Sequence, residues 1–235
     1  MTLRQAEDSI ARSFGWLSGF YVPDPLLDEV RACVNRAQQV LYKERAWTFA
    51  SASGTFATVA GTGSYDGASR MDAERGFRKV IDRTNTRMIL PIPFESWLDK
   101  SVDVAQGTVD FAAAGPPTAG SNPGIYLHRT PDAIITVDYW FWRLPTALAV
   151  SGTSASGQAL DIPTRWEPAL LELSTILSGE IILPPEDRGL LDRHYRLYQK
   201  YLSDMKREEG SLPDTLLQAD PLTNQSVDRT DRPWG

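Results

Sequence analysis

The spacing of hydrophobic residues changes twice along the chain, and these changes limit the folds that it can adopt. Up to about residue 46, apolar residues recur every three or four positions, which is typical of amphipathic helices. From Trp47 to about Leu160 the apolar runs are short, rich in β-branched and aromatic residues, and bounded by Gly and Pro. Such runs predict β-strands. From Ile162 the helical spacing returns, so we expect an α+β fold in which an antiparallel β domain is inserted into a helical layer.

Two helices are expected before the β region. The longer one begins at Asp24-Pro25, where Asp suits the N-cap and Pro suits the first helical position, and it ends near Arg45. A shorter helix is expected from about Leu3 to Phe14. The residues that recur at helical spacing along the longer helix are Leu26, Leu27, Val30, Val34, Ala37, Leu41 and Glu44.

The clearest strand signal is the stretch GIYLHRTPDAIITVDYWFWRLPTAL, from Gly124 to Leu148. It indicates a strand, a Pro-Asp corner, and a second strand that ends at Leu-Pro. Because side chains alternate along a strand, the second strand has two distinct faces. The face expected in the core carries Ile135, Val137, Tyr139 and Phe141. The other, mixed face carries Ile134, Thr136, Asp138, Trp140 and Trp142.

Two more helices follow the β region. The first opens after Ile162-Pro163, and Pro184-Pro185 breaks it. The second ends on Lys206-Arg207, which suit a helix C-terminus. Its apolar stripe is expected to comprise Leu190, His194, Leu197, Tyr198, Tyr201, Leu202 and Met205. The predicted division of the chain is 1–46, 47–161, 162–210, and an extended tail at 211–235 that cannot bury enough surface to fold alone.

Charge and composition exclude several functions. The net charge is −6, and no basic patch of the kind that binds nucleic acid is visible. No apolar run is long enough to span a membrane, and the N-terminus lacks a signal-peptide pattern, so we expect a protein made in the cytoplasm. The single cysteine, Cys33, is expected to be a small buried residue.

No residue pattern predicts catalysis. The two histidines, His128 and His194, lie far apart in the sequence, and a structural or surface role is the simpler explanation for each. The glycines at 61, 63 and 67 miss the spacing of a dinucleotide site, and the serine-rich segment 151–157 misses that of a hydrolase nucleophile. We therefore expect a protein that is not an enzyme, with no cofactor and no metal.

The order of several segments is informative when they are taken together. A helix ends in RAWTFA, and SGTFATVAG, GFRKVIDRT, IPFESWLD and AAAGPP follow. Then come the Gly124–Leu148 stretch, DIPTRWEPALLELS, and a closing helix with HYRLYQKYL. From roughly Pro25 to Met205 the chain resembles the head–tail adaptor (connector) proteins of tailed bacteriophages, similar to tail tubular protein A of short-tailed phages.

This resemblance implies a structural virion protein at the head–tail junction. It implies a ring, of twelve subunits in the usual case, that docks beneath the portal protein and extends the DNA channel toward a downstream tail or nozzle protein. The partners would be the portal, neighbouring copies and that tail protein, and DNA would pass without specific binding. The resemblance implies no catalytic residues and no membrane.

Two groups of residues are candidates for contacts with the portal or with neighbouring subunits. Trp140 and Trp142 share the mixed strand face, where they either meet another subunit or lie under a loop or helix of their own. The tail carries separated apolar anchors at Leu216, Leu217, Leu222, Val227 and Trp234. Two alternatives stay open: a carbohydrate-binding β module that uses Tyr139, Trp140 and Trp142, and a tail-associated hydrolase.

Overall fold

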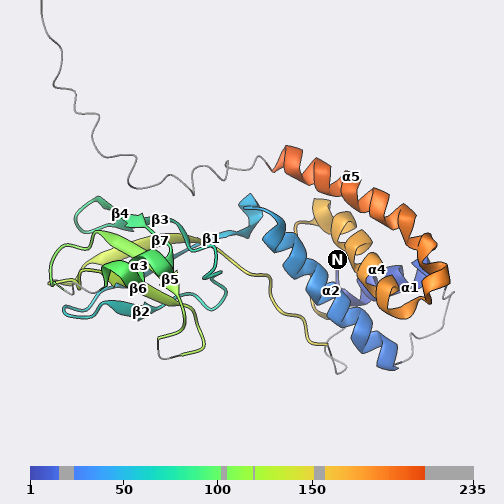
Figure 1. Cartoon of the computed structure of the whole chain (residues 1–235), viewed down its shortest axis with the longest axis horizontal. Helices are drawn as coiled ribbons and strands as arrows, with labels where there is room; N and C mark the ends of the chain where they lie inside the picture. The colour runs from blue at the N-terminus through green and yellow to red at the C-terminus, as the bar shows by residue number, and fades with distance from the viewer. Residues whose placement is uncertain (16–23, 102–104, 119, 151–156, 210–235) are drawn as a thin grey trace, which may run out of the picture.

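The computed structural model describes residues 1–15, 24–101, 105–118, 120–150 and 157–209. These residues form two lobes, one of helices and one built on a β-sheet (Figure 1). The chain crosses between the lobes after the second helix and again after the last strand. The predicted α+β fold, with a β domain inserted into a helical layer, is therefore confirmed.

Among the residues that the structure describes, four α-helices form the helical lobe: α1 (Leu3–Ser13), α2 (Asp24–Glu44), α4 (Glu167–Ile182) and α5 (Asp192–Glu208). Helix α4 contacts the other three, so the early and late helices share one core, as predicted. Fully or almost fully buried residues from all four form its centre, including Leu3, Ile10, Val34, Leu41, Leu170, Ile176 and Met205. Each of these helices is stabilised mainly by burying its apolar face there.

Local signals set the helix ends. Thr2 and Gln5 form a capping box at the start of α1, which satisfies backbone donors that the helix leaves unpaired. Helix α4 has Pro in its first turn, follows the short 3₁₀ helix η3 (Thr164–Trp166), and ends before Pro184-Pro185. Before α5 the chain forms a second 3₁₀ helix, η4 (Pro185–Leu191). The apolar stripe predicted for the last helix is wrong at its first member, because Leu190 and Leu191 lie in η4 and not in the helix. Leu191 is buried and Leu190 is exposed.

In the sheet lobe the described residues form seven strands in the order β1-β7-β3-β4-β5-β6-β2. The strands are β1 (Ser51–Ala57), β2 (Ser64–Asp66), β3 (Phe77–Asp82), β4 (Arg87–Pro91), β5 (Phe111–Gly115), β6 (Gly124–His128) and β7 (Thr136–Trp142). A short 3₁₀ helix, η1 (Thr48–Ala50), leads into β1. The long strand β7 lies between β1 and β3 and pairs with both. The last strand of the lobe in sequence therefore connects two of its early strands.

The expectation of a fully antiparallel sheet needs a correction. Strands β4 and β5 pair in parallel, at Leu90 with Phe111, and the other pairs between the described strands are antiparallel. A parallel pair needs a crossover connection. The short helix α3 (Phe94–Lys100) supplies it and packs on β5 and β6.

The sheet curls around its own apolar core. Rings from the two edge strands approach each other, with Phe56 of β1 and Tyr65 of β2 at 4.8 Å between centroids. The predicted core face of β7 is confirmed, because all four of its members are buried. They pack with residues of the neighbouring strands, including Val80, Ile89, Ala112, Ile125 and Leu127.

Candidate functional site

The residues that could carry chemistry lie apart and have structural surroundings. His194 joins α5 to α4 through a 2.6 Å contact between its Nδ1 atom and a carboxylate oxygen of Glu172. His128 lies in the other lobe, on β6, with its ring centroid 5.4 Å from that of Phe111. Cys33 is buried on α2, and burial raises the pKa of its thiol. Within the described part of the chain, no group of three or more His, Cys, Asp or Glu residues could hold a metal ion.

The joint between the two lobes is an extensive network of hydrogen bonds and ion pairs, and Asp161 lies at its centre. The Asp161 carboxylate pairs with Arg70, from the loop before β3, and with Arg143, just after β7, at 3.1 Å. It also accepts hydrogen bonds from the backbone N–H of Thr146 at 2.9 Å and from its hydroxyl at 3.0 Å. Asp161 thereby connects the loop before β3, the end of β7 and the segment that leaves the sheet lobe.

The backbone of Asp161 is fixed to the helical lobe. Its N–H donates to Oε1 of Gln38 at 2.8 Å, and its carbonyl accepts from the Tyr42 hydroxyl at 2.6 Å. Both partners lie on α2. Burial alone would raise the pKa of the Asp161 carboxyl, but the hydrogen bonds from Thr146 and the charges of Arg143 and Arg70 outweigh it, so this pKa is lowered. The residue is therefore held in its charged form.

Two further contacts close the joint. The Arg75 guanidinium, from the loop before β3, donates to the carbonyls of Tyr42 at 2.9 Å and of Arg45 at 2.8 Å, at the end of α2. These carbonyls lack partners within the helix, and a cation there also complements the helix dipole. Beyond the end of α5, buried Glu209 accepts from the Thr48 hydroxyl and, at 2.8 Å, from the Trp166 indole.

The convex face of the sheet exposes an apolar strip that crosses three strands. We call Ile81, Met88, Leu90 and Phe111 the outer patch. Ile81 lies opposite Met88, and Leu90 lies opposite Phe111, so the four are neighbours on one face. Met88 is 61% exposed and Leu90 is 39% exposed. Contiguous apolar surface of this kind is typical of sites that contact other proteins.

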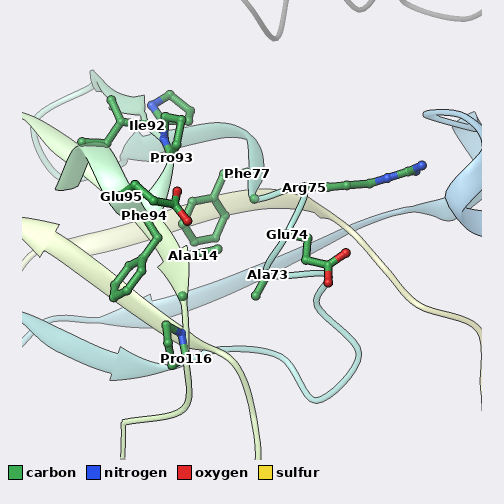
Figure 2. Close-up of a pocket in the computed structure, with 13 residues that line it drawn as sticks. Ala73, Glu74, Arg75, Phe77, Ile92, Pro93, Phe94, Glu95, Ala114 and Pro116 are labelled. Atoms are coloured by element: carbon green, nitrogen blue, oxygen red, sulfur yellow. The ribbon is translucent and has the colours of Figure 1, made fainter. Parts of the chain in front are cut away.

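A groove of about 420 Å³ opens beside the joint on the sheet lobe. Its walls are three segments: the loop 73–77, the segment 91–95 that leads into α3, and residues 114–116 at the end of β5. Figure 2 shows Phe77, Ile92 and Phe94 around the groove, with Arg75 extending away from it toward the helical lobe. The ring of Phe94 takes the space beside Gly115 that any larger residue would need.

The predicted interface residues have different positions. Trp140 is half-buried on the outer face of β7, and the Lys79 ammonium lies 5.5 Å from the centroid of its ring. Trp142 is only 2% exposed and belongs to the core of the helical lobe. It therefore packs within its own subunit, the second of the two arrangements that the sequence left open. The five predicted tail anchors, from Leu216 to Trp234, lie outside the described residues.

The joint is the feature that the sequence did not reveal. Its charged residues are scattered, and Arg70 and Asp161 are separated by most of the β region. The one usable signal is position, because Asp161 directly precedes the Ile162-Pro163 pair that opens the late helices.

Within the described residues, no helix is long and apolar enough to cross a membrane. A search of curated proteins finds none that matches this chain. A family model, that of the SU10 adaptor protein, matches residues 1–221 and so covers both lobes and the start of the tail. A match over nearly the whole length leads to one conclusion: the chain belongs to the SU10 adaptor protein family.

Proposed function

We propose that this protein is a structural component of a tailed-phage virion that joins the head to the tail. The observation that carries the proposal is the family match over residues 1–221. The geometry supports it, because the polar network around Asp161 connects the two lobes of one subunit. A non-enzymatic role agrees with both observations.

The proposed assembly is a closed ring of subunits beneath the portal, twelve in the usual case, that extends the DNA channel toward a tail or nozzle protein. Such a ring needs head-to-tail contacts between copies. The outer patch and the neighbouring Trp140 offer an exposed surface for one side of that contact. The net charge of −6 per subunit supports passage of DNA without binding, since like charges repel at short range. The specific likeness to tail tubular protein A stays a prediction.

The tail is the proposed clasp on the portal or on an adjacent subunit. Its apolar residues are spaced along a segment with three prolines, which lower the entropy lost on ordering. The anchors are Leu216, Leu217, Leu222, Val227 and Trp234. A chain that ends at Gly210 should fold with an unchanged circular dichroism spectrum and fail to assemble on portal rings. Normal assembly of this shortened chain would rule out the clasp.

The decisive experiment mixes the purified protein with portal rings and images the product by electron microscopy. Closed rings of this protein on one face of the portal are expected. A protein that stays monomeric in the mixture, and gains thermal stability from a sugar instead, would overturn the adaptor role.

The carbohydrate-binding alternative loses its predicted site. A sugar platform would need Tyr139, Trp140 and Trp142 on one exposed surface. Tyr139 faces the sheet core on the other side of β7, and Trp142 is buried in the helical lobe. Of the three, only Trp140 keeps exposed surface.

A further inference from the structure

We infer that the groove beside the joint binds Leu216 and Leu217 of this chain's own tail in the free subunit. The inference rests on the proposed function in one respect: the groove would bind the tail before the subunit docks on the portal. The occupant is the tail of the same subunit, and the anchors are Leu216 and Leu217.

The groove has the character of a site for apolar side chains. Its volume of about 420 Å³ lies within the range of pockets that bind ligands, roughly 300–1,000 Å³. Phe77, Ile92 and Phe94 line it together with three prolines, and no described segment fills it. Seating two leucines here would remove apolar surface from water on both sides.

The tail begins close to the groove because its starting point is anchored at the joint. Glu209, the last described residue, is bound to Thr48 and Trp166. One turn earlier, Lys206 pairs with Glu44 at the end of α2. That end of α2 is in turn bound by the Arg75 guanidinium, and Arg75 lines the groove. Figure 1 shows the end of α5 and the end of α2 on the side that faces the sheet lobe.

The length of chain suits this short path. Gly210 to Thr215 is six residues, which span roughly 20 Å when extended, so the inference requires the groove to lie within about that distance of Glu209. Pro213 lowers the entropy lost when the segment is ordered. The family match continues twelve residues beyond Glu209 and stops at Pro221, so the proposed segment belongs to the shared unit while residues 222–235 do not.

This arrangement gives the tail two alternative binding sites, the groove of its own subunit and a site on the portal. In the free subunit the leucines are covered, which limits association between copies. On a portal ring the same leucines can exchange their own groove for a site on the partner, and the rest of the tail follows them.

The first test measures amide hydrogen exchange in the full-length protein without any portal present. The variant Leu216→Asp/Leu217→Asp is expected to raise exchange in residues 73–77 and 91–95 by about tenfold, because charged side chains do not enter an apolar groove. The matched variant Leu222→Asp/Val227→Asp, beyond the shared unit, should leave both segments unchanged. Equal exchange in all three proteins would overturn the inference.

A second test distinguishes the subunit's own tail from that of a neighbour. With oxidised glutathione as the oxidant, Leu217→Cys combined with Glu95→Cys, at the groove rim, should form a disulfide within one chain about tenfold faster than Leu217→Cys combined with Glu180→Cys. Cys33 is buried and does not compete. Dimers linked by disulfides, or equal rates for the two pairs, would contradict the inference. Since neither test involves the portal, a negative result here leaves the adaptor role to be judged by imaging.

Discussion

At the scale of single residues, Asp161 shows how one side chain can join two lobes. Its backbone is bound to α2, and its carboxylate is bound to Arg70, Arg143 and Thr146 of the sheet lobe. Charge-assisted hydrogen bonds are stronger than neutral ones, and several act here on one group. The relative position of the lobes therefore depends on a charge rather than on apolar packing alone.

Replacing Asp161 by Asn should destabilise the protein and loosen the joint. The amide keeps the size of the side chain but loses the charge, so Arg70 and Arg143 lose their shared partner. We expect the free energy of unfolding to fall by about 1–3 kcal/mol, measured by urea denaturation. Asp132→Asn, at an exposed position, is the matched control and should change it little. Equal effects of the two substitutions would contradict a special role for Asp161.

Acid should weaken the joint. For Glu209, burial raises the pKa of the carboxyl, but hydrogen bonds from Thr48, Trp166 and Arg165 outweigh it, so this pKa is lowered, as it is for Asp161. The unfolded chain therefore takes up these protons first. The stability contributed by the two carboxylates is fully present when the pH is above their ordinary pKa values, 4.5 for Glu209 and 3.8 for Asp161. It is lost as the pH falls through the lower pKa values of the folded protein.

The measurement is the urea midpoint as a function of pH. The variant Asp161→Asn/Glu209→Gln should lose less stability on acidification than the natural chain. An unchanged slope between the two proteins would show that other carboxylates dominate the acid response.

At the scale of elements, the pairing of β1 with β7 depends on one small residue. Gly54 lies opposite Tyr139, and a Cβ atom at Gly54 would lie 2.5 Å from the Tyr139 ring. The ring can cover β1 closely only because that atom is absent. This packing connects the edge strand β1 to the core of the sheet.

Gly54→Ala should therefore destabilise the sheet lobe. The new methyl group forces Tyr139 or the strand to move, which costs about 1–3 kcal/mol of unfolding free energy. Gly189→Ala is the control, because a Cβ atom there meets nothing within 4 Å. Thermal unfolding followed by circular dichroism compares the two. Equal stability of both variants would show that the Tyr139 contact is easily relieved.

At the scale of the whole molecule, a joint held by several hydrogen bonds and ion pairs, together with an exposed outer patch, suits a protein that docks on a partner. Met88→Asp should leave the thermal unfolding midpoint nearly unchanged, because the side chain is 61% exposed, and should reduce ring assembly on the portal at least tenfold. Ile181→Asp, at a residue 56% exposed on α4, is the matched control. Assembly that is lost in the control and kept in Met88→Asp would place the subunit contact on the helical lobe instead.

The periodicity of the sequence was sufficient to predict the helices, most of the strands and the insertion of the sheet lobe into the helical lobe. These features repeat over many residues, so the pattern is strong, as along α2 or β7. The helix α3 was missed, because seven residues are too few to establish a period. Without α3, nothing indicated that β4 and β5 would pair in parallel.

Only the tertiary structure determined the burial and contacts of residues whose partners are remote in the chain. Strand alternation placed Trp140 and Trp142 on one face, yet Trp142 enters the helical core because β7 ends where the lobes meet. Likewise Asp161 became the centre of the joint through partners on α2, before β3 and after β7. A local pattern records the face on which a side chain lies; what covers that face depends on elements that the chain brings back from far away.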